Sequence, residues 1–320
     1  MGCEPALEIM KIVFMGTPAL CVPCFDALRH DHEIVAVVTQ PDKIGGRGHE
    51  IIASPLKKRA VELRIPVLQP ERARNAEFIE ELSKFSPDAI AVVAYGQILP
   101  REVLEMAPRG CVNLHFSLLP RWRGAAPVQY AIWHGDKTTG VTTQWMAEKL
   151  DAGDIIQQVE VEITAGETSG ELLERLTGIG ADVLRETFQM LQNDIAPRTP
   201  QDEGGITFCP QIKKEMAQID WSKSAREIEN LVRAMNPWPT AFFEFKGAPI
   251  KVWRALAEEG DAVAACPWGT VGDLDNNEIR VITGESSIRL LEVQAAGKPR
   301  MKAGDWARGA RLEVGETRIG

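Results

Sequence analysis

Apolar residues in the first 192 positions come in short runs separated by amphipathic stretches. Residues 9–14, 34–39 and 88–94 are nearly continuous apolar runs, which is typical of strands covered on both faces of a parallel sheet. Residues 75–82 place apolar side chains at helical spacing after a good N-cap residue. Repeated strand–helix units of this kind predict a doubly wound, mostly parallel α/β sheet.

Two later segments, 140–146 and 155–163, alternate polar and apolar residues and predict strands added antiparallel to that sheet. The residues Thr168-Ser169-Gly170-Glu171 have the pattern of a capping box, so we expect a long helix that ends near Gln192. The polar, glycine-rich residues 40–49 follow the second strand, and we expect them to form a flexible surface loop without regular structure.

The pattern changes after residue 192. Residues 193–212 are rich in proline and glycine and predict a linker. One amphipathic helix then precedes several short strand candidates, which predict a small OB-like β-barrel of a kind that often binds oligonucleotides. We therefore expect a leader at 1–8, a catalytic domain at 9–192 and a C-terminal barrel at 213–320.

A polar pair marks the centre of the first domain. Asn113 and His115 follow the apolar Cys111-Val112 and would point to the same face of an extended strand. Pro120 then breaks regular structure, so the pair lies at the carboxyl end of a strand, where open α/β sheets bind ligands. Asn supplies an amide donor and His can act as acid or base. The alternative is that both residues merely close the polar end of the strand.

Asp151 lies in a tight turn, Leu-Asp-Ala-Gly-Asp, between the two alternating strands. Beside His115 its carboxylate would hold the imidazole in one orientation and favour the cation. The commoner role of a turn Asp is to bond its own backbone. The sequence has no Ser or Cys nucleophile elbow, so the three residues favour direct transfer through a tetrahedral intermediate over covalent catalysis.

Charge and composition exclude some classes of protein. The 320 residues carry a net charge of −9, which argues against a surface that binds nucleic acid everywhere. The 16 basic and 16 acidic residues from Lys213 onward balance, so the acidic excess lies entirely before them. No apolar run is long enough for a membrane helix and the start lacks the features of a signal peptide, so we expect a cytoplasmic protein.

The six cysteines are scattered, and only Cys21 and Cys24 have motif spacing. A thioredoxin-like redox pair is one interpretation. Two small apolar residues on the buried face of the first helix is the interpretation we favour. The five histidines include no H-E-x-x-H pattern, so we expect no metal.

Around the polar pair the sequence resembles the 10-formyltetrahydrofolate-dependent formyltransferases. The resemblance rests on the order Asn113-x-His115-x-Ser117-Leu118-Leu119-Pro120-x-x-x-Gly124, followed by Asp151 in Leu-Asp-x-Gly. The loop Gln40-Pro41-Asp42 and the segments Ile219-Asp220-Trp221-Ser222 and Asn236-Pro237-Trp238-Pro239 are similar to those of members that formylate initiator Met-tRNA.

The resemblance implies a reaction and its residues. Asn113, His115 and Asp151 would be catalytic: Asn113 and protonated His115 would stabilise the oxyanion as the amino group of methionyl-tRNA attacks the formyl carbon. Asp151 would hold His115 and help take the amine's proton through water, and His115 would protonate the departing folate nitrogen. The folate would lie along Ser117, Leu118, Leu119 and Pro120 and along Tyr95, Gly96, Gln97, Ile98 and Leu99.

The resemblance also implies that the loop after the second strand reaches the acceptor end of initiator tRNA through Arg47 and Lys43, helped by the barrel of a monomeric enzyme. From the residues alone, Arg47 would be an exposed loop arginine. His49-Glu50 stand where family members often carry basic residues, and Phe116 stands where a small residue is common. Three alternatives stay open: a formyltransferase for a nucleotide sugar or glycinamide ribonucleotide, an RNA-binding module, and a redox protein using Cys21 and Cys24.

Overall fold

The computed structural model describes residues 9–45, 50–258, 260, 266–275 and 277–320, so the expected leader at 1–8 lies outside the described residues. The chain forms two compact units. The first contains the residues up to Ala125 together with 139–161 and 173–209. The second contains 126–138, 162–172 and the residues from Pro210 onward.

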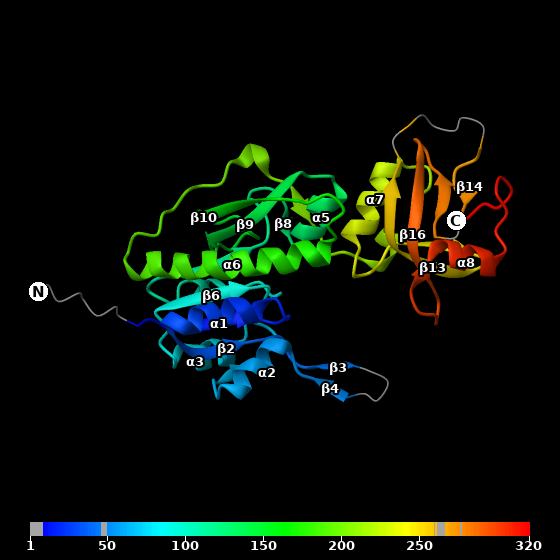
Figure 1. Ribbon diagram of the computed structural model, residues 1–320. Coiled ribbons are helices and arrows are strands. Elements are labelled where there is room, and N and C mark those ends of the chain that lie inside the picture. Colours follow the sequence, from blue (N-terminus) through cyan, green and yellow to red (C-terminus); the bar gives the residue numbers. More distant parts are fainter. Residues whose placement is uncertain (1–8, 46–49, 259, 261–265, 276) are drawn as a thin grey trace, which may run out of the picture. The chain divides into compact units, whose positions relative to one another are not determined.

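The first unit is built on a seven-stranded sheet with the order β10-β9-β7-β6-β1-β2-β5 (Figure 1). Its strands are β1 (Lys11–Gly16), β2 (Glu33–Val38), β5 (Val67–Leu68), β6 (Ala89–Val93), β7 (Cys111–His115), β9 (Thr138–Trp145) and β10 (Ile155–Glu162). Its helices are α1 (Cys21–Asp31), α2 (Pro55–Glu62), α3 (Ala76–Ser83), α4 (Arg101–Leu104) and most of α6 (Ser169–Gln192).

The pairing confirms the predicted doubly wound sheet. The strands β7, β6, β1, β2 and β5 run parallel to their neighbours, whereas β9 runs antiparallel to β7. The expected antiparallel addition is therefore correct for β9. Strand β1 is an interior strand of the sheet, and its residues after Lys11 are buried, as the continuous apolar run predicts.

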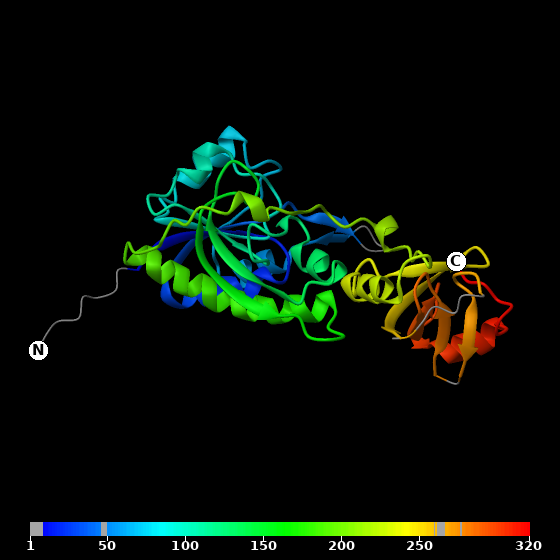
Figure 2. The ribbon, with the colours of Figure 1, turned by 90° about the horizontal axis from the view of Figure 1, so that it is seen from above.

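Helices cover both faces of this sheet. On one face, Phe14 packs edge-on against Phe25 of α1, with ring centroids 5.6 Å apart. On the other, Val13 and Met15 belong to an apolar cluster with Phe78 and Leu82 of α3. Figures 1 and 2 show α6 running alongside β9 and β10, where Thr187 and Thr143 share a buried hydrogen bond of 2.8 Å. The capping box that starts α6 is formed by Thr168 and Glu171, as predicted.

The expectation of an irregular loop at 40–49 is wrong in part. Strands β3 (Lys43–Gly45) and β4 (Glu50–Ile52) pair antiparallel, while residues 46–49 lie outside the described residues. Lys57 of α2 holds the base of this hairpin, because its Nζ lies 2.5 Å from Asp42 and 2.6 Å from Gln69. The polar composition concealed the hairpin, since backbone pairing needs no apolar run.

The second unit contains an antiparallel sheet with the order β12-β13-β16-β15-β14, and β17 pairs with β16. Among the described residues no pairing joins β12 to β14, so the predicted OB-like barrel is an open, curled half-barrel (Figure 1). Its strands are β12 (Phe242–Phe245), β13 (Ala248–Ala257), β14 (Val271–Leu274), β15 (Ile279–Ile282), β16 (Ser287–Ala295) and β17 (Met301–Lys302). Its helices are α5 (Pro127–Trp133), α7 (Ala225–Ala234) and α8 (Ala303–Ala310).

Residues 193–209 run along the first unit. Thr199 pairs with Ile155, and β11 (Phe208–Cys209) pairs in parallel with β8 (Arg123–Gly124). Two single-turn 3₁₀ helices, Glu203–Gly205 and Lys214–Ala217, interrupt the extended chain. The part of the chain that the structure describes contains no helix long and apolar enough to cross a membrane.

Candidate active site

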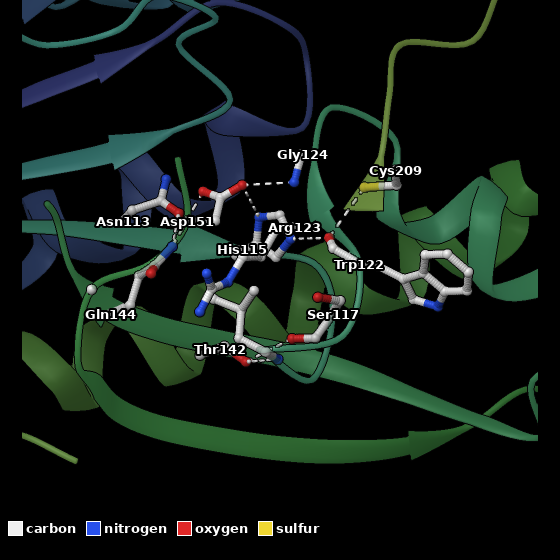
Figure 3. A network of polar contacts seen from close by, with 12 residues as sticks. Asn113, His115, Ser117, Trp122, Arg123, Gly124, Thr142, Gln144, Asp151 and Cys209 are labelled. Carbon is white, nitrogen blue, oxygen red and sulfur yellow. Dashed lines mark hydrogen bonds and ion pairs between the residues drawn. The ribbon is translucent and has the colours of Figure 1, made fainter. Parts of the chain in front are cut away.

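Three predicted residues come together at the carboxyl end of β7. Asn113 and His115 project from that strand, and Asp151 comes from the turn between β9 and β10 (Figure 3). Strand register places Asn113 directly opposite Gln144 of β9. The order of strands therefore brings side chains from two distant parts of the sequence to one edge of the sheet.

Each ring nitrogen of His115 faces an oxygen atom. Only 6% of the residue is exposed, and its Nε2 lies 2.8 Å from the carbonyl oxygen of Trp122. A carbonyl oxygen can only accept, so Nε2 carries the proton and donates. The other nitrogen, Nδ1, lies 3.8 Å from Oδ2 of Asp151. Nδ1 is therefore the ring nitrogen that faces the carboxylate.

Asp151 is fixed by donors on both of its oxygens. The backbone N–H of Gly124 donates to Oδ2 at 2.8 Å, and the side-chain amide of Gln144 donates to Oδ1 at 3.3 Å. The residue has a φ of +46°, in the left-handed region that Asp adopts more readily than most non-glycine residues.

The amide of Asn113 also has a defined orientation. Its Nδ2 donates to the carbonyl oxygen of Val92 at 3.1 Å, and its Oδ1 accepts from Gln144 at 3.3 Å. An amide nitrogen has two hydrogens. Among the described residues, a partner is assigned to one of them, which leaves the second to donate to a ligand.

The Ser-Leu-Leu-Pro segment after β7 is rigid because its backbone is bonded. The hydroxyl of Ser117 donates to the carbonyl oxygen of Arg121 at 2.6 Å. Thr142 on β9 donates to the carbonyl oxygen of Ser117 at 2.6 Å and accepts from the backbone N–H of Leu119 at 3.2 Å. The bond between Leu119 and Pro120 is cis. Residues 117–120 thus form a fixed wall beside His115.

The second predicted folate segment, residues 95–99, follows β6, the neighbour of β7 in the sheet. Gln97 is held by the carbonyl oxygen of Pro70 and the N–H of Ala73. Tyr95 is 2% exposed, whereas Ile98 is 79% exposed. The two predicted segments therefore lie at the same edge of the sheet, and Ile98 presents an apolar side chain there.

Two other predictions have different outcomes. Arg47 lies outside the described residues, and Lys43 is exposed on β3. The thiols of Cys21 and Cys24 are fully buried, and burial raises the pKa of both, that of Cys24 to about 12. This confirms that they are buried residues of α1, and a reactive thiolate pair is disfavoured.

The sequence did not reveal the donors around Asp151. Gln144 is 2% exposed and bonds both Asn113 and Asp151, while Gly124 and Trp122 act through backbone groups that no side-chain pattern reports. The one available signal was a glutamine within an otherwise well-packed strand candidate. Among the described residues, no group of three or more His, Cys, Asp or Glu side chains could hold a metal ion.

Comparison with protein families gives two matches. The formyl transferase family matches residues 10–187, and the C-terminal domain of formyl transferases matches residues 211–311. The chain is similar to the methionyl-tRNA formyltransferase of Clostridioides difficile (strain 630), with 44% identity over 307 residues that cover 96% of this chain and 99% of that protein. It is 45% identical over 315 residues to the protein of the same name from Geobacillus thermodenitrificans (97% and 98% covered).

Solved structures share the fold. HypX from Aquifex aeolicus in complex with tetrahydrofolic acid matches with a TM-score of 0.64 and 17% identity, covering 96% of this chain and 48% of that chain. Methionyl-tRNA formyltransferase from Clostridium thermocellum matches with a TM-score of 0.54 and 19% identity, covering 79% of this chain and 96% of that chain. At these identities the likeness concerns the fold alone.

Proposed function

The chain belongs to the formyl transferase family, and we propose that Asn113, His115 and Asp151 form the centre at which it moves a formyl group from 10-formyltetrahydrofolate to the amino group of initiator Met-tRNA. The observation that carries this assignment is the hydrogen bonding of His115. Its Nε2 is occupied by the carbonyl oxygen of Trp122, so Nδ1 is left to exchange a proton beside Asp151.

Asp151 is the base in this proposal. The donors Gly124 and Gln144 keep its carboxylate in place, and the attacking amine loses its proton toward this carboxylate through water. His115, protonated at Nδ1, lies beside it and supplies the proton that the departing folate nitrogen needs. Positioned proton transfer of this kind contributes about 10²–10⁴-fold to a rate.

Asn113 is the oxyanion donor. One of its amide hydrogens bonds the carbonyl oxygen of Val92, and that bond fixes the orientation of the amide. The second hydrogen donates to the formyl oxygen as negative charge develops there. Fixed donors of this kind need no reorganisation during the reaction, which is why they are effective.

The folate binds along residues 117–120 and 95–99. 10-Formyltetrahydrofolate supplies the formyl group when bound, and the bonded backbone of the first segment gives it a rigid wall. The exposed aliphatic side chain of Ile98 fits a flat pterin ring. Among the described residues, the atom nearest to a Cβ added at Gly96 is Gln40 Nε2, at 3.5 Å, and this open space lets backbone groups approach the ligand.

The tRNA contacts are assigned to the β3–β4 hairpin and the C-terminal unit. Lys43 lies on β3, and Arg47 follows it in the sequence but lies outside the described residues; basic side chains of this segment would bind phosphates of the acceptor end. We predict that the catalytic domain ends at residue 192 and that the tRNA-binding domain begins at residue 213. We expect the enzyme to be cytoplasmic. We also expect it to be a monomer, and sedimentation of the purified protein would measure this oligomeric state.

The acceptor is tested by offering several. Purified protein is given 10-formyltetrahydrofolate with initiator Met-tRNA, elongator Met-tRNA or an amino-sugar nucleotide. We expect formylation of initiator Met-tRNA only. Transfer to the sugar nucleotide without transfer to either tRNA would contradict the assignment.

A further inference from the structure

Gln201 bonds several groups that surround the candidate active site. It belongs to residues 193–209 of the first unit, and its amide nitrogen lies 2.9 Å from the carbonyl oxygen of Asp151 and 2.8 Å from that of Gly153. The same nitrogen lies 3.3 Å from the side-chain oxygen of Gln144. Its amide oxygen accepts from Arg123 at 3.0 and 2.7 Å.

The orientation of this amide is determined by its partners. The guanidinium of Arg123 can only donate, so it must face the oxygen of Gln201. The carbonyl oxygens of Asp151 and Gly153 can only accept, so they must face the nitrogen. Reversing the amide would lose every one of these bonds, which makes Gln201 a directional link between Arg123 and the Asp151 turn.

The turn that Gln201 bonds is tightly packed. Asp151 has a φ of +46°, and a Cβ at Gly153 would come within 1.6 Å of the carbonyl oxygen of Trp145. The turn therefore packs tightly against β9. Gln201 bridges two of its carbonyl groups from outside, and Gln144, which bonds the Asp151 carboxylate, touches the same amide.

On its other side Gln201 holds the loop that completes the site. Arg123 is 9% exposed and lies between Trp122, whose carbonyl accepts from His115, and Gly124, whose N–H donates to Asp151. Pairing of β8 with β11 fixes the same loop, because the N–H of Arg123 donates to Thr207 at 2.9 Å. Both halves of the His115–Asp151 pair therefore depend on residues 199–209.

We propose that Gln201 is a positioning residue for formyl transfer, which sets the Asp151 carboxylate relative to His115 by bridging the Asp151 turn to Arg123. It acts on the chemical step through Asp151 and touches neither substrate. The proposal rests on the function assigned to Asp151 and His115 above.

The test compares three variants in single-turnover transfer to initiator Met-tRNA with enzyme in excess, so that slow rates are measured. Gln201→Met removes both sets of bonds at similar length. Gln201→Glu keeps an acceptor for Arg123 and removes the donor to Asp151 and Gly153. Gln157→Met is the matched control, since Gln157 makes its 2.8 Å bond to Glu186 at the surface of the same unit.

We expect Gln201→Met and Gln201→Glu to lower the saturated single-turnover rate by about 10–10²-fold, because a displacement near 1 Å has effects of that order. The substrate concentrations that give half of this rate should match those of Gln157→Met. The thermal unfolding temperature should fall in both Gln201 variants, because buried polar groups lose their partners, and the rates are therefore measured well below it. An undiminished rate in Gln201→Glu would mean that the Arg123 contact suffices and would overturn the proposal, as would an undiminished rate in Gln201→Met.

A double variant separates this proposal from the assignment of Asp151. If Gln201 acts through Asp151, Gln201→Met should cost little more once Asp151→Asn is present, since residues that act as a unit are not additive. The full loss repeated in the Asp151→Asn background would overturn the positioning role. Undiminished transfer by Asp151→Asn alone would instead overturn the proposed function.

Discussion

Backbone groups fix the orientation of the three side chains that we propose to be catalytic, Asn113, His115 and Asp151. The carbonyl oxygen of Val92 accepts a hydrogen bond from Asn113, and that of Trp122 accepts one from Nε2 of His115. The backbone N–H of Gly124 donates to the Asp151 carboxylate. In the proposed mechanism, these bonds hold the donor, the acid and the base in fixed places at the end of the strand.

Replacing Asn113 tests the donor. Asn113→Ala removes the hydrogen assigned to the formyl oxygen, and we expect the single-turnover rate to fall about 10²–10³-fold, the usual effect of losing one oxyanion donor. Asn193→Ala is the control, because Asn193 is exposed and bonds only locally to the carbonyl of Gln189. An Asn113→Ala rate equal to that of the control would remove the donor from the mechanism.

We expect His32 to make the stability of the protein depend on pH. Its ring is 5% exposed, and neither ring nitrogen has a hydrogen-bond partner among the described residues. Burial lowers its pKa below 6.5; nearby Asp31 raises the pKa and Arg185 lowers it, both less strongly. The unfolded chain therefore binds a proton that the folded chain does not, and the free energy of unfolding decreases as pH falls below about 6.5.

The expected contribution is at most about 1.4 kcal/mol per pH unit. His32→Leu removes the titrating group and fits the apolar site beside Phe188, whose ring centroid is 6.3 Å away. Denaturant unfolding between about pH 5 and 7 should show a smaller decrease in the variant than in the unaltered protein. An identical slope for both would show that His32 does not titrate in this way.

At the residue scale, side-chain type and spacing predicted the three central residues but not their partners. Gln144 was overlooked because one glutamine in an alternating strand resembles an exposed position. Its burial depends on β9 lying beside β7, a pairing of residues 31 positions apart. Trp122 and Gly124 contribute backbone groups, which residue identity does not report.

At the scale of elements, the short pairing of β8 with β11 fixes the loop whose backbone bonds Asp151. The N–H groups of Arg123 and Ala125 donate to Thr207 and Cys209 at 2.9 and 2.8 Å. Between them, Gly124 has a φ of +128°, and its own N–H remains available for Asp151. This pairing explains why a glycine stands at that position.

Gly124→Ala should break this arrangement. An added Cβ would come within 2.5 Å of the carbonyl oxygen of Cys209, so β8 and β11 must separate. We expect a loss of about 2 kcal/mol or more in stability and a fall in transfer rate, because a clash is added to backbone strain. Gly315→Ala is the control, since Gly315 has a φ of +79° with open space around its Cβ. Equal effects of the two variants would show that strain alone accounts for the loss.

Long elements were predictable and most of the very short strands were not. Apolar runs identified β1, β2 and β6, and capping boxes identified the starts of α6 and α7. Strands β3, β4, β8 and β11 have two or three residues each, too few to show a period. Their pairing is decided by partners elsewhere in the chain, which is why residues 40–49 were expected to be irregular.

At the scale of the whole molecule, charge is distributed unevenly along the chain. The acidic excess lies before Lys213, and the C-terminal residues are neutral overall, so tRNA binding cannot rest on a uniformly basic surface. Local basic side chains and the shape of an unpaired acceptor end would then set the choice of tRNA. Sequence composition predicted this balance, whereas it could not say that the barrel is an open half-barrel.

The most direct measurement of the account is single-turnover formyl transfer to initiator Met-tRNA by His115→Ala, compared with His30→Ala, whose side chain is 76% exposed. We expect His115→Ala to unfold at the temperature of the control, to bind both substrates, and to transfer the formyl group about 10²–10⁴-fold more slowly, because it lacks the acid at Nδ1. Full turnover by His115→Ala would contradict the assignment of the active site.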